Sequence, residues 1–145
     1  MIRKCTINDL KNLTEMSIKL WPNHNIDEMY SEIADILVNE NSVYFIAEEG
    51  GIAIGFAQCQ IRSDYVEGTS KSPVGYLEAI YIEEDYRLKN YGSILVRACE
   101  EWTKENNCIE FGSDCEIENT NSYEFHLKMG FKEANRIICF TKKLD

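Results

Sequence analysis

The stretch YLEAIYIEEDYRLKNYGSILVRACEEW, residues 76–102, decides the fold of this chain. Its first seven residues are rich in β-branched and aromatic side chains, which predicts a strand, and one carboxylate, Glu78, is set into it. From Ser93 onward the apolar residues follow helical spacing. We therefore expect a strand, a tight turn and a long amphipathic helix.

The turn before this helix is suited to binding an anion. A helix start leaves several backbone N–H groups without partners, and the helix dipole adds partial positive charge. Phosphate groups bind well at such a position, and Arg87 and Lys89 add to the attraction. The alternative is an ordinary strand-to-helix connection with a solvated basic bend.

Length and composition predict one domain, residues 1–145, with a continuous core, because 44% of the residues are hydrophobic and only 2 are proline. No apolar run approaches the roughly 20 residues of a membrane span, and the first residues lead into no signal-peptide core. We therefore expect a cytoplasmic protein. The 6 cysteines show no CxxC spacing, which disfavours a metal site, and most are expected to be reduced core side chains.

The net charge is −10, from 25 acidic and 15 basic residues. This balance disfavours nucleic acid as a partner and suits a cationic substrate.

The pattern along the chain predicts the order β-α-α-β-β-β-α-β-α-β, which is an α/β fold. Asn8 and Asp27 are candidate caps of the first two helices, and Gly130 ends a short helix. The remaining expected elements are strands at residues 2–7, 43–48, 52–61 and 108–113, the short helix at 119–129, and one or two last strands after residue 131, of which 136–142 is the clearest. The long connection at 62–75, with Tyr65 near its start, is more often functional than idle.

This order and the turn resemble the GNAT acetyltransferases, whose acetyl-CoA loop runs Arg/Gln, two residues, Gly, any residue, Gly/Ala. Arg87 and Gly92 match that motif, whereas Asn90 stands where the family usually has Gly. Asn tolerates left-handed backbone better than most residues. The resemblance implies a mixed, mostly antiparallel sheet with splayed parallel central strands, flanked by helices.

The resemblance also implies acetyl-CoA as cosubstrate, with its pantetheine arm pairing along the fourth strand and its pyrophosphate in the turn. The implied contacts are Ile80, Tyr81, Ile82, Arg87, Leu88, Lys89, Asn90, Tyr91, Gly92, Ser93 and Asn119. In ENTNSYEFHLKMGF, residues 118–131, His126 takes the place of a family Tyr credited with protonating the departing CoA thiolate. An imidazole could do the same, since histidine ordinarily titrates near neutrality. The alternative is that His126 only packs on its helix.

A closer resemblance is to the aminoglycoside 6′-N-acetyltransferases within that superfamily. It is carried by LWPNH near residue 20, IAIGFA at 52, IRSDYVEG at 61, SPVGYLEAIYI at 72 and GSDCEIENT at 112. The implied substrate contacts are Trp21, His24, Tyr65, Glu78, Asp114 and a last position that is acidic in relatives but is Asn135 here. The resemblance further implies antibiotic resistance as the outcome, and a homodimer in contact through its C-terminal strands.

The chemistry accounts for these residue types. Aminoglycosides carry several ammonium groups and hydroxyls, which suit carboxylates and hydrogen-bonding rings. Because only a neutral amine is nucleophilic, a proton acceptor is required, and Glu78 is the candidate. The alternatives are a solvent-facing Glu78, an Asp114 that caps a helix and a Trp21 that only packs. The alternative functions are acetylation of a polyamine, amino sugar or protein N-terminus, or a non-catalytic acyl-CoA-binding module.

Overall fold

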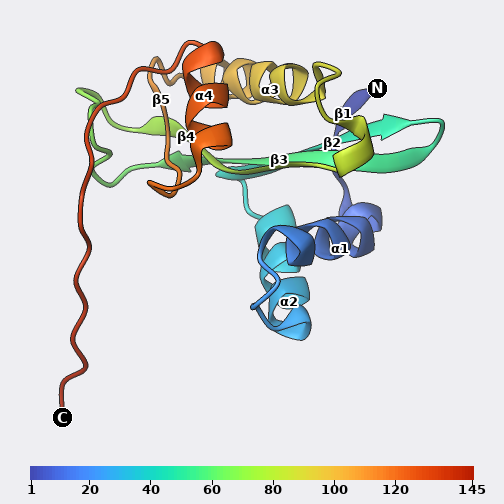
Figure 1. Ribbon diagram of the computed structural model, residues 1–145, viewed down its shortest axis with the longest axis horizontal. Helices are drawn as coiled ribbons and strands as arrows, with labels where there is room; N and C mark the ends of the chain where they lie inside the picture. The colour runs from blue at the N-terminus through green and yellow to red at the C-terminus, as the bar shows by residue number, and fades with distance from the viewer. The chain divides into compact units, whose positions relative to one another are not determined.

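The computed structural model describes all 145 residues (Figure 1). Its elements are β1 (Ile2–Lys4), the 3₁₀ helix η1 (Ile7–Asp9), α1 (Leu10–Leu20), α2 (Ile26–Leu37), β2 (Ser42–Glu49), β3 (Ile52–Arg62), β4 (Val74–Ile82), the 3₁₀ helix η2 (Glu84–Tyr86), α3 (Tyr91–Glu105), β5 (Phe111–Ser113) and α4 (Thr120–Lys128). The chain falls into two compact units, Met1–Asp114 and Cys115–Asp145. None of its helices is both long and apolar enough to cross a membrane.

The first unit is built on a five-stranded sheet in the order β1-β2-β3-β4-β5. Neighbouring strands are antiparallel except β4 and β5, which are parallel. Helices α1 and α2 cover one face of this sheet and α3 covers the other (Figure 1). The expected mixed, mostly antiparallel sheet flanked by helices is confirmed.

Strands β4 and β5 pair over a short distance only. The last paired residues are Leu77 and Ser113, after which β4 continues to Ile82 without β5 beside it. The expected splay of the parallel strands is therefore present, and it begins at Leu77.

Helix α3 packs closely against β4 at Gly75. A Cβ at this position would lie 2.3 Å from the hydroxyl oxygen of Thr103, so the packing requires glycine.

The core lies on both faces of the sheet. Under α1 and α2, Leu13, Ile46 and Phe56 are completely buried in one apolar cluster. Leu95 and Val96 of α3 are completely buried as well. Alternating side chains of the central strands supply both layers, as expected for a sheet covered on two sides. These layers hold β4, the strand that carries the candidate site, between two packed surfaces.

A β-bulge interrupts β4 at Glu78. Gln58 of β3 lies opposite Ala79, but the next residue, Cys59, lies opposite Leu77, so Glu78 is the extra residue. Bulges redirect a side chain and are common beside active sites. The one carboxylate of this strand is thus also the one residue of β4 that breaks its register with β3.

The helix caps differ from the expected ones. Thr6, not Asn8, caps η1, and it forms a reciprocal capping box with Asp9, which in turn precedes α1. Asn25, not Asp27, caps α2, by accepting a hydrogen bond from the Glu28 N–H. Several neighbouring polar residues can cap each start, and the direction from which the chain enters the helix selects one of them. Helix α3 begins at Tyr91, two residues before Ser93, from which helical spacing was expected.

The last expected strands do not form. Residues 131–145 contain no regular element, although 136–142 was the clearest of the predicted strands, and β5 is shorter than predicted. A strand exists only where a neighbour accepts its ladder hydrogen bonds, whatever its side-chain pattern.

Cys115 and Cys139 are exposed rather than in the core, whereas the other four cysteines are buried or partly buried, and all six are free.

Candidate active site

Glu78 is held by an arginine from the neighbouring strand. Arg62, the last residue of β3, donates from Nε to Glu78 Oε2 at 3.1 Å and from Nη2 to the same oxygen at 2.8 Å, and Nη2 also contacts Oε1. The Glu78 side chain is 15% exposed and that of Arg62 is 37% exposed. Although partial burial opposes the charged form, the hydrogen bonds and charge of Glu78 raise the pKa of Arg62. The carboxylate is therefore ion-paired and has a defined orientation.

Asp114 joins the same cluster through Tyr76. The Tyr76 hydroxyl donates to Asp114 Oδ2. Burial, and then the Asp114 carboxylate, raise the pKa of Tyr76, so the phenol remains protonated as a donor. The Arg62 guanidinium carbon lies 3.5 Å from the centre of the Tyr76 ring. Both predicted carboxylates thus belong to one network of four side chains, in the region where β4 and β5 part.

The turn before α3 has the backbone shape that an anion site needs. Leu88 and Asn90 have φ of 61° and 69°, both in the left-handed region. Asn90 lies at the start of α3, and the first helical hydrogen bond runs from the Ile94 N–H to its carbonyl. The N–H groups of residues 91–93 therefore have no helical acceptor and point out of the helix start. Asn90 provides the left-handed conformation for which the family motif usually has Gly.

Basic side chains lie around this turn. Arg87 donates from Nε to the Ile82 carbonyl at 2.8 Å, and its guanidinium lies over the Tyr81 ring. Lys89 Nζ is 5.3 Å from the centre of the Tyr86 ring. Both Arg87 and Lys89 are exposed. The residues thus fit a pyrophosphate: free N–H groups, a helix dipole and two cations, one of them anchored to the end of β4.

The end of β4 is tied to α1 on the other side of the site. Lys19 Nζ contacts Glu83 Oε1 at 2.7 Å, and the Tyr81 hydroxyl donates to Glu83 Oε2 at 3.2 Å. Desolvation raises the pKa of Tyr81, as do the charge and hydrogen bond of Glu83. Ile80, Tyr81 and Ile82 lie in the part of β4 beyond its pairing with β5. This is the part of β4 where the family resemblance implies pantetheine pairing.

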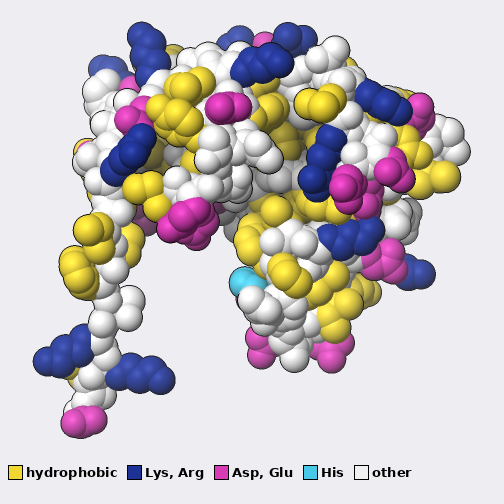
Figure 2. Space-filling model, viewed as in Figure 1, with side chains coloured by type: hydrophobic (Ala, Val, Ile, Leu, Met, Phe, Trp, Pro, Cys, Tyr) yellow, Lys and Arg dark blue, Asp and Glu magenta, His cyan; other side chains and the backbone are white.

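The loop between α1 and α2 carries the aromatic pair Trp21 and His24. Their rings are stacked with centroids 6.0 Å apart, and Trp21 is 37% exposed. His24 also lines a recess of about 360 Å³. The other residues of this recess are Asn23, Asn25, Glu28, Met29 and Glu32. Acidic side chains gather over the end of α2 that is farthest from the sheet (Figure 2).

Tyr65 is presented by an anchored loop, residues 63–73. Tyr65 is 77% exposed, whereas its neighbour Val66 is 6% exposed in a small cluster with Val74 and Tyr76. The Glu110 carboxylate accepts hydrogen bonds from the loop's backbone at two consecutive N–H groups, those of residues 70 and 71. The loop is therefore anchored at Val66 and at residues 70–71, and the exposed Tyr65 precedes the first of these anchors.

The second unit contains the other predicted site residues. Asn119 caps α4 by accepting from the Ser122 N–H at 3.1 Å. His126 Nδ1 lies 2.7 Å from the Ser122 carbonyl, and the His126 ring packs 5.1 Å from that of Phe131. Because a carbonyl only accepts, Nδ1 carries a proton. Exposed Asn135 accepts from the Arg136 N–H through its side-chain oxygen.

The structure thus links some predicted residues and leaves others apart. Glu78 and Asp114 share one network, and Trp21 and His24 form a pair. No hydrogen bond or ring contact joins that pair, or Tyr65, to the network. Sequence reasoning missed Arg62 and Tyr76. Their only sequence signals were a single cation at the end of an apolar strand and an aromatic residue two positions before Glu78.

A mixed sheet whose parallel strands separate beside a carboxylate, next to an anion-binding turn, fits a transferase that uses a phosphate-bearing cosubstrate. Residues 10–131 match the model of the acetyltransferase (GNAT) family, and the chain belongs to this family. The chain is similar to the aminoglycoside N(6')-acetyltransferases type 1 of Acinetobacter haemolyticus, at 33% identity over 99% of both chains, and of Salmonella enteritidis, at 35% over 98% of both. It is also similar to the solved structure of AAC(6')-Iy in complex with the bisubstrate analogue CoA-S-monomethyl-acetylneamine, with a TM-score of 0.96, 35% identity and coverage of 99% of this chain and 98% of that one.

Proposed function

We propose that this protein transfers the acetyl group of acetyl-CoA to the 6′-amino group of aminoglycosides and thereby confers resistance to them. The observation that carries the proposal is the pair of linked carboxylates, Glu78 and Asp114, where β4 and β5 separate. The relatives named above support the same reaction, since they are aminoglycoside acetyltransferases similar over nearly the whole chain.

The proposed chemistry begins with the substrate ammonium. Glu78 and Asp114 attract it, and Glu78, directly or through one water, accepts the proton that the amine must lose. The neutral amine then attacks the acetyl carbonyl carbon and forms the C–N bond. The C–S bond breaks and the CoA thiolate leaves, while the nitrogen releases a second proton to water as the amide forms. No cysteine is needed as a nucleophile, because amine attack on a thioester requires no covalent enzyme intermediate.

The proposed cosubstrate contacts follow from the turn and from β4. Free N–H groups at residues 91–93, with Arg87 and Lys89, hold the pyrophosphate, while Ile80, Tyr81 and Ile82 provide the strand edge for the pantetheine. Leu88 and Asn90 shape the turn through their left-handed backbone. Asn119 is proposed to contribute from the start of α4.

His126 is proposed as the acid that protonates the thiolate. With Nδ1 bonded to a carbonyl, the other ring nitrogen of a neutral His126 carries no proton. His126 must therefore be an imidazolium to donate from that nitrogen.

The aminoglycoside contacts are proposed at Trp21, His24, Tyr65, Glu78, Asp114 and Asn135. Exposed aromatic rings beside carboxylates suit the apolar faces and ammonium groups of an amino sugar. Glu28 and Glu32 also line the recess at His24, so this recess carries negative charge of its own.

We also propose a homodimer in contact through the C-terminal segment, residues 131–145. This segment has no strand partner within the chain, and it exposes large apolar side chains, which is unusual without a covering surface. They are Ile137, Ile138, Phe140 and Leu144. The test is light scattering at micromolar concentration, where a monomer would refute the dimer. A single domain over residues 1–145 and a cytoplasmic location stay predictions.

The experiment that tests the function is a thiol-release assay with acetyl-CoA and one acceptor at a time. Kanamycin should release CoA thiol, and mass spectrometry with NMR should place one acetyl group on the 6′-nitrogen. Spermidine and a peptide N-terminus serve as the competing acceptors. Turnover with either of those and none with kanamycin would assign another GNAT activity, and no turnover with any would favour a binding module.

A further inference from the structure

The carboxylate proposed to accept the proton is engaged before any substrate is present. Arg62 makes three N–H contacts to Glu78, from two nitrogens to both carboxylate oxygens. Two-pronged arginine–carboxylate contacts are strong and directional, because the guanidinium is planar and its donors are fixed. Glu78 is the unpaired bulge residue of β4, so the ladder between β3 and β4 does not fix its direction. Arg62 supplies that orientation from the adjacent strand.

Arg62 has a second contact, which reaches toward the other carboxylate. Its guanidinium lies on the face of the Tyr76 ring, 3.5 Å from the ring centre, and the Tyr76 hydroxyl donates to Asp114. Stacking of this kind is favourable for a guanidinium and an aromatic face. Arg62 therefore contacts both Glu78 and Tyr76, and the hydroxyl of Tyr76 binds Asp114.

This arrangement still leaves room for a substrate cation. An ionised carboxylate offers about four acceptor positions, of which the Arg62 contacts use about three on Glu78 and Tyr76 uses one on Asp114. An arginine is never deprotonated in proteins at ordinary pH. Arg62 can thus hold Glu78 throughout a reaction cycle without exchanging a proton with it.

We infer that Arg62 is a positioning residue for acetyl transfer, which sets the orientation of Glu78 directly and the place of Asp114 through the Tyr76 ring. This inference rests on the proposed function. It predicts that removing the guanidinium harms the chemical step more than the binding of either substrate, because Glu78 stays in the site but loses its direction.

The test is steady-state kinetics with acetyl-CoA and kanamycin for Arg62→Met, Arg62→Lys, Glu78→Gln and the double variant Arg62→Met/Glu78→Gln. Arg62→Met should lower kcat by about tenfold or more, with a smaller change in the KM of kanamycin and none in that of acetyl-CoA. Arg62→Lys should restore only part of kcat, because a point charge cannot contact both oxygens and also stack on the ring. The double variant should have the kcat of Glu78→Gln alone, since Arg62 acts on the chemical step through Glu78, whereas its effect through Asp114 should appear in the KM of kanamycin.

The matched control is Arg3→Met. Arg3, like Arg62, binds a carboxylate through two nitrogens, that of Asp9, and it also contacts Glu48, but it lies in β1 at the far edge of the sheet. This variant should lose thermal stability and keep wild-type kcat and KM. Comparing Arg3→Met with Arg62→Met distinguishes the loss of a stabilising ion pair from the loss of a contact that orients a catalytic carboxylate.

Three outcomes would overturn the inference. They are wild-type kcat in folded Arg62→Met, wild-type kcat in Arg62→Lys, or losses that add in the double variant. Arg62→Lys keeps the charge, so it provides the answer if Arg62→Met does not fold. If wild-type protein acetylates no aminoglycoside, the proposed function fails and the inference falls with it; if wild type is active and the Arg62 variants match it, only the inference fails.

Discussion

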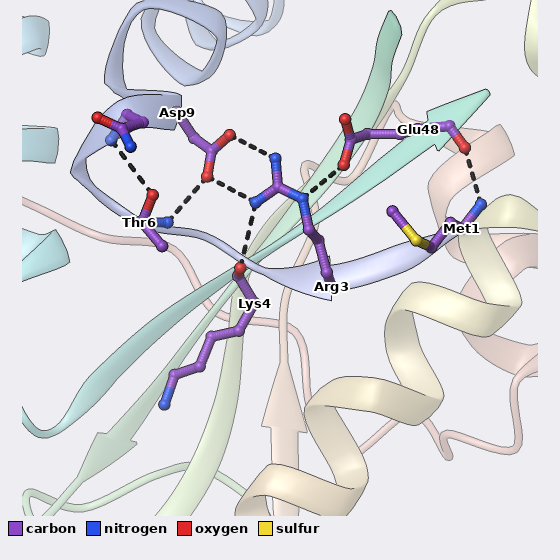
Figure 3. A network of polar contacts seen from close by, with 7 residues as sticks. Met1, Arg3, Lys4, Thr6, Asp9 and Glu48 are labelled. Carbon is purple, nitrogen blue, oxygen red and sulfur yellow. Dashed lines mark hydrogen bonds and ion pairs between the residues drawn. The ribbon is translucent and has the colours of Figure 1, made fainter. Parts of the chain in front are cut away.

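Two arginines of this protein, Arg3 and Arg62, each bind one carboxylate through two nitrogens, but in very different settings. Arg3 binds both oxygens of Asp9, at 2.8 and 2.7 Å, and Glu48 Oε1 at 2.5 Å (Figure 3). The Thr6 N–H also donates to Asp9, and the amino group of Met1 donates to the Glu48 carbonyl. Asp9 is 5% exposed. This network ties β1 to the start of α1 and to β2, and it is closed to solvent at Asp9.

The network of Arg62, Glu78, Tyr76 and Asp114 is exposed to solvent at its aspartate, whereas the network of Arg3, Asp9 and Glu48 is buried at its aspartate. Glu78 lies on a bulge, Asp114 is exposed, and both belong to the region where β4 and β5 part. Both networks contain an arginine, an aspartate and a glutamate, so these charged residue types do not separate a structural ion pair from a candidate site. The backbone does: Asp9 belongs to a capped helix start, whereas Glu78 is a residue that leaves the regular ladder.

The largest effect is expected for Glu78→Gln. Loss of a general base costs about a hundredfold or more in rate, so kcat for kanamycin should fall by that order while acetyl-CoA affinity is unchanged. The paired variant is Glu48→Gln, which removes the corresponding charge from the Arg3 network. Steady-state kinetics and thermal melts of both should show a kinetic loss only in Glu78→Gln. Normal turnover of a folded Glu78→Gln would exclude Glu78 as proton acceptor.

A third arginine sharpens the comparison because it pairs with a carbonyl instead of a carboxylate. Arg87→Glu places a negative charge at the proposed pyrophosphate turn, and acetyl-CoA affinity should fall by about tenfold or more, the equivalent of roughly 1.4 kcal/mol. Calorimetry measures this directly. Arg97→Glu, an exposed charge reversal within α3, is the control. Equal affinities for the two variants would remove the assignment of the turn.

Asp114→Asn should act on binding more than on chemistry. Removing one partner of a charge pair costs roughly 2–5 kcal/mol when both groups are buried, and less at this exposed aspartate, so we expect the KM of kanamycin to rise about tenfold. Raising the salt concentration should weaken drug binding to wild type more than to the variant, because screening acts on the contact that the variant has lost. The measurement is steady-state kinetics of both proteins at two ionic strengths. If the KM of kanamycin depends equally on salt in the variant and in wild type, Asp114 is not a charged contact to the drug.

The smallest kinetic effect is expected for Arg3→Met, whose consequence is stability. The hydrogen bonds from Arg3 hold the pKa of Asp9 below its usual range. Such a carboxyl stabilises the fold above its unfolded pKa of about 3.9, and that contribution is lost as the pH falls through the lower folded value. At pH 7 the variant should lose about 1–3 kcal/mol, a figure reduced for the 36% exposure of the Arg3 side chain.

The measurement for Arg3→Met is denaturant unfolding at several pH values. The difference from wild type should be full at neutral pH and should shrink once Asp9 is protonated in both proteins. Lys11→Met removes only an exposed pair with Glu15 and should change stability little. A difference that is constant down to strongly acidic pH would show that Arg3 stabilises by packing and not through the Asp9 charge.

Local pattern predicted most of the fold but placed its boundaries imperfectly. The strand, turn and helix of residues 76–102 were anticipated because apolar periodicity is a property of the segment itself. The caps were wrong at Asn8 and Asp27, since polar residues one to three positions apart compete for the same helix start. The strand expected at 136–142 does not form within the chain, because strand pairing requires a neighbour that the segment's own sequence cannot specify.

The sequence by itself determined the α/β class, the order of the elements other than the last strands, the basic turn and the carboxylate in β4. Only the tertiary structure decided that Glu78 is a bulge residue, that Arg62 binds it, and that Tyr76 connects the pair to Asp114. A bulge depends on the register of two strands, and these contacts join residues 16 and 38 positions apart. Periodicity reports which face of an element is buried, whereas the partners that meet there are chosen by packing.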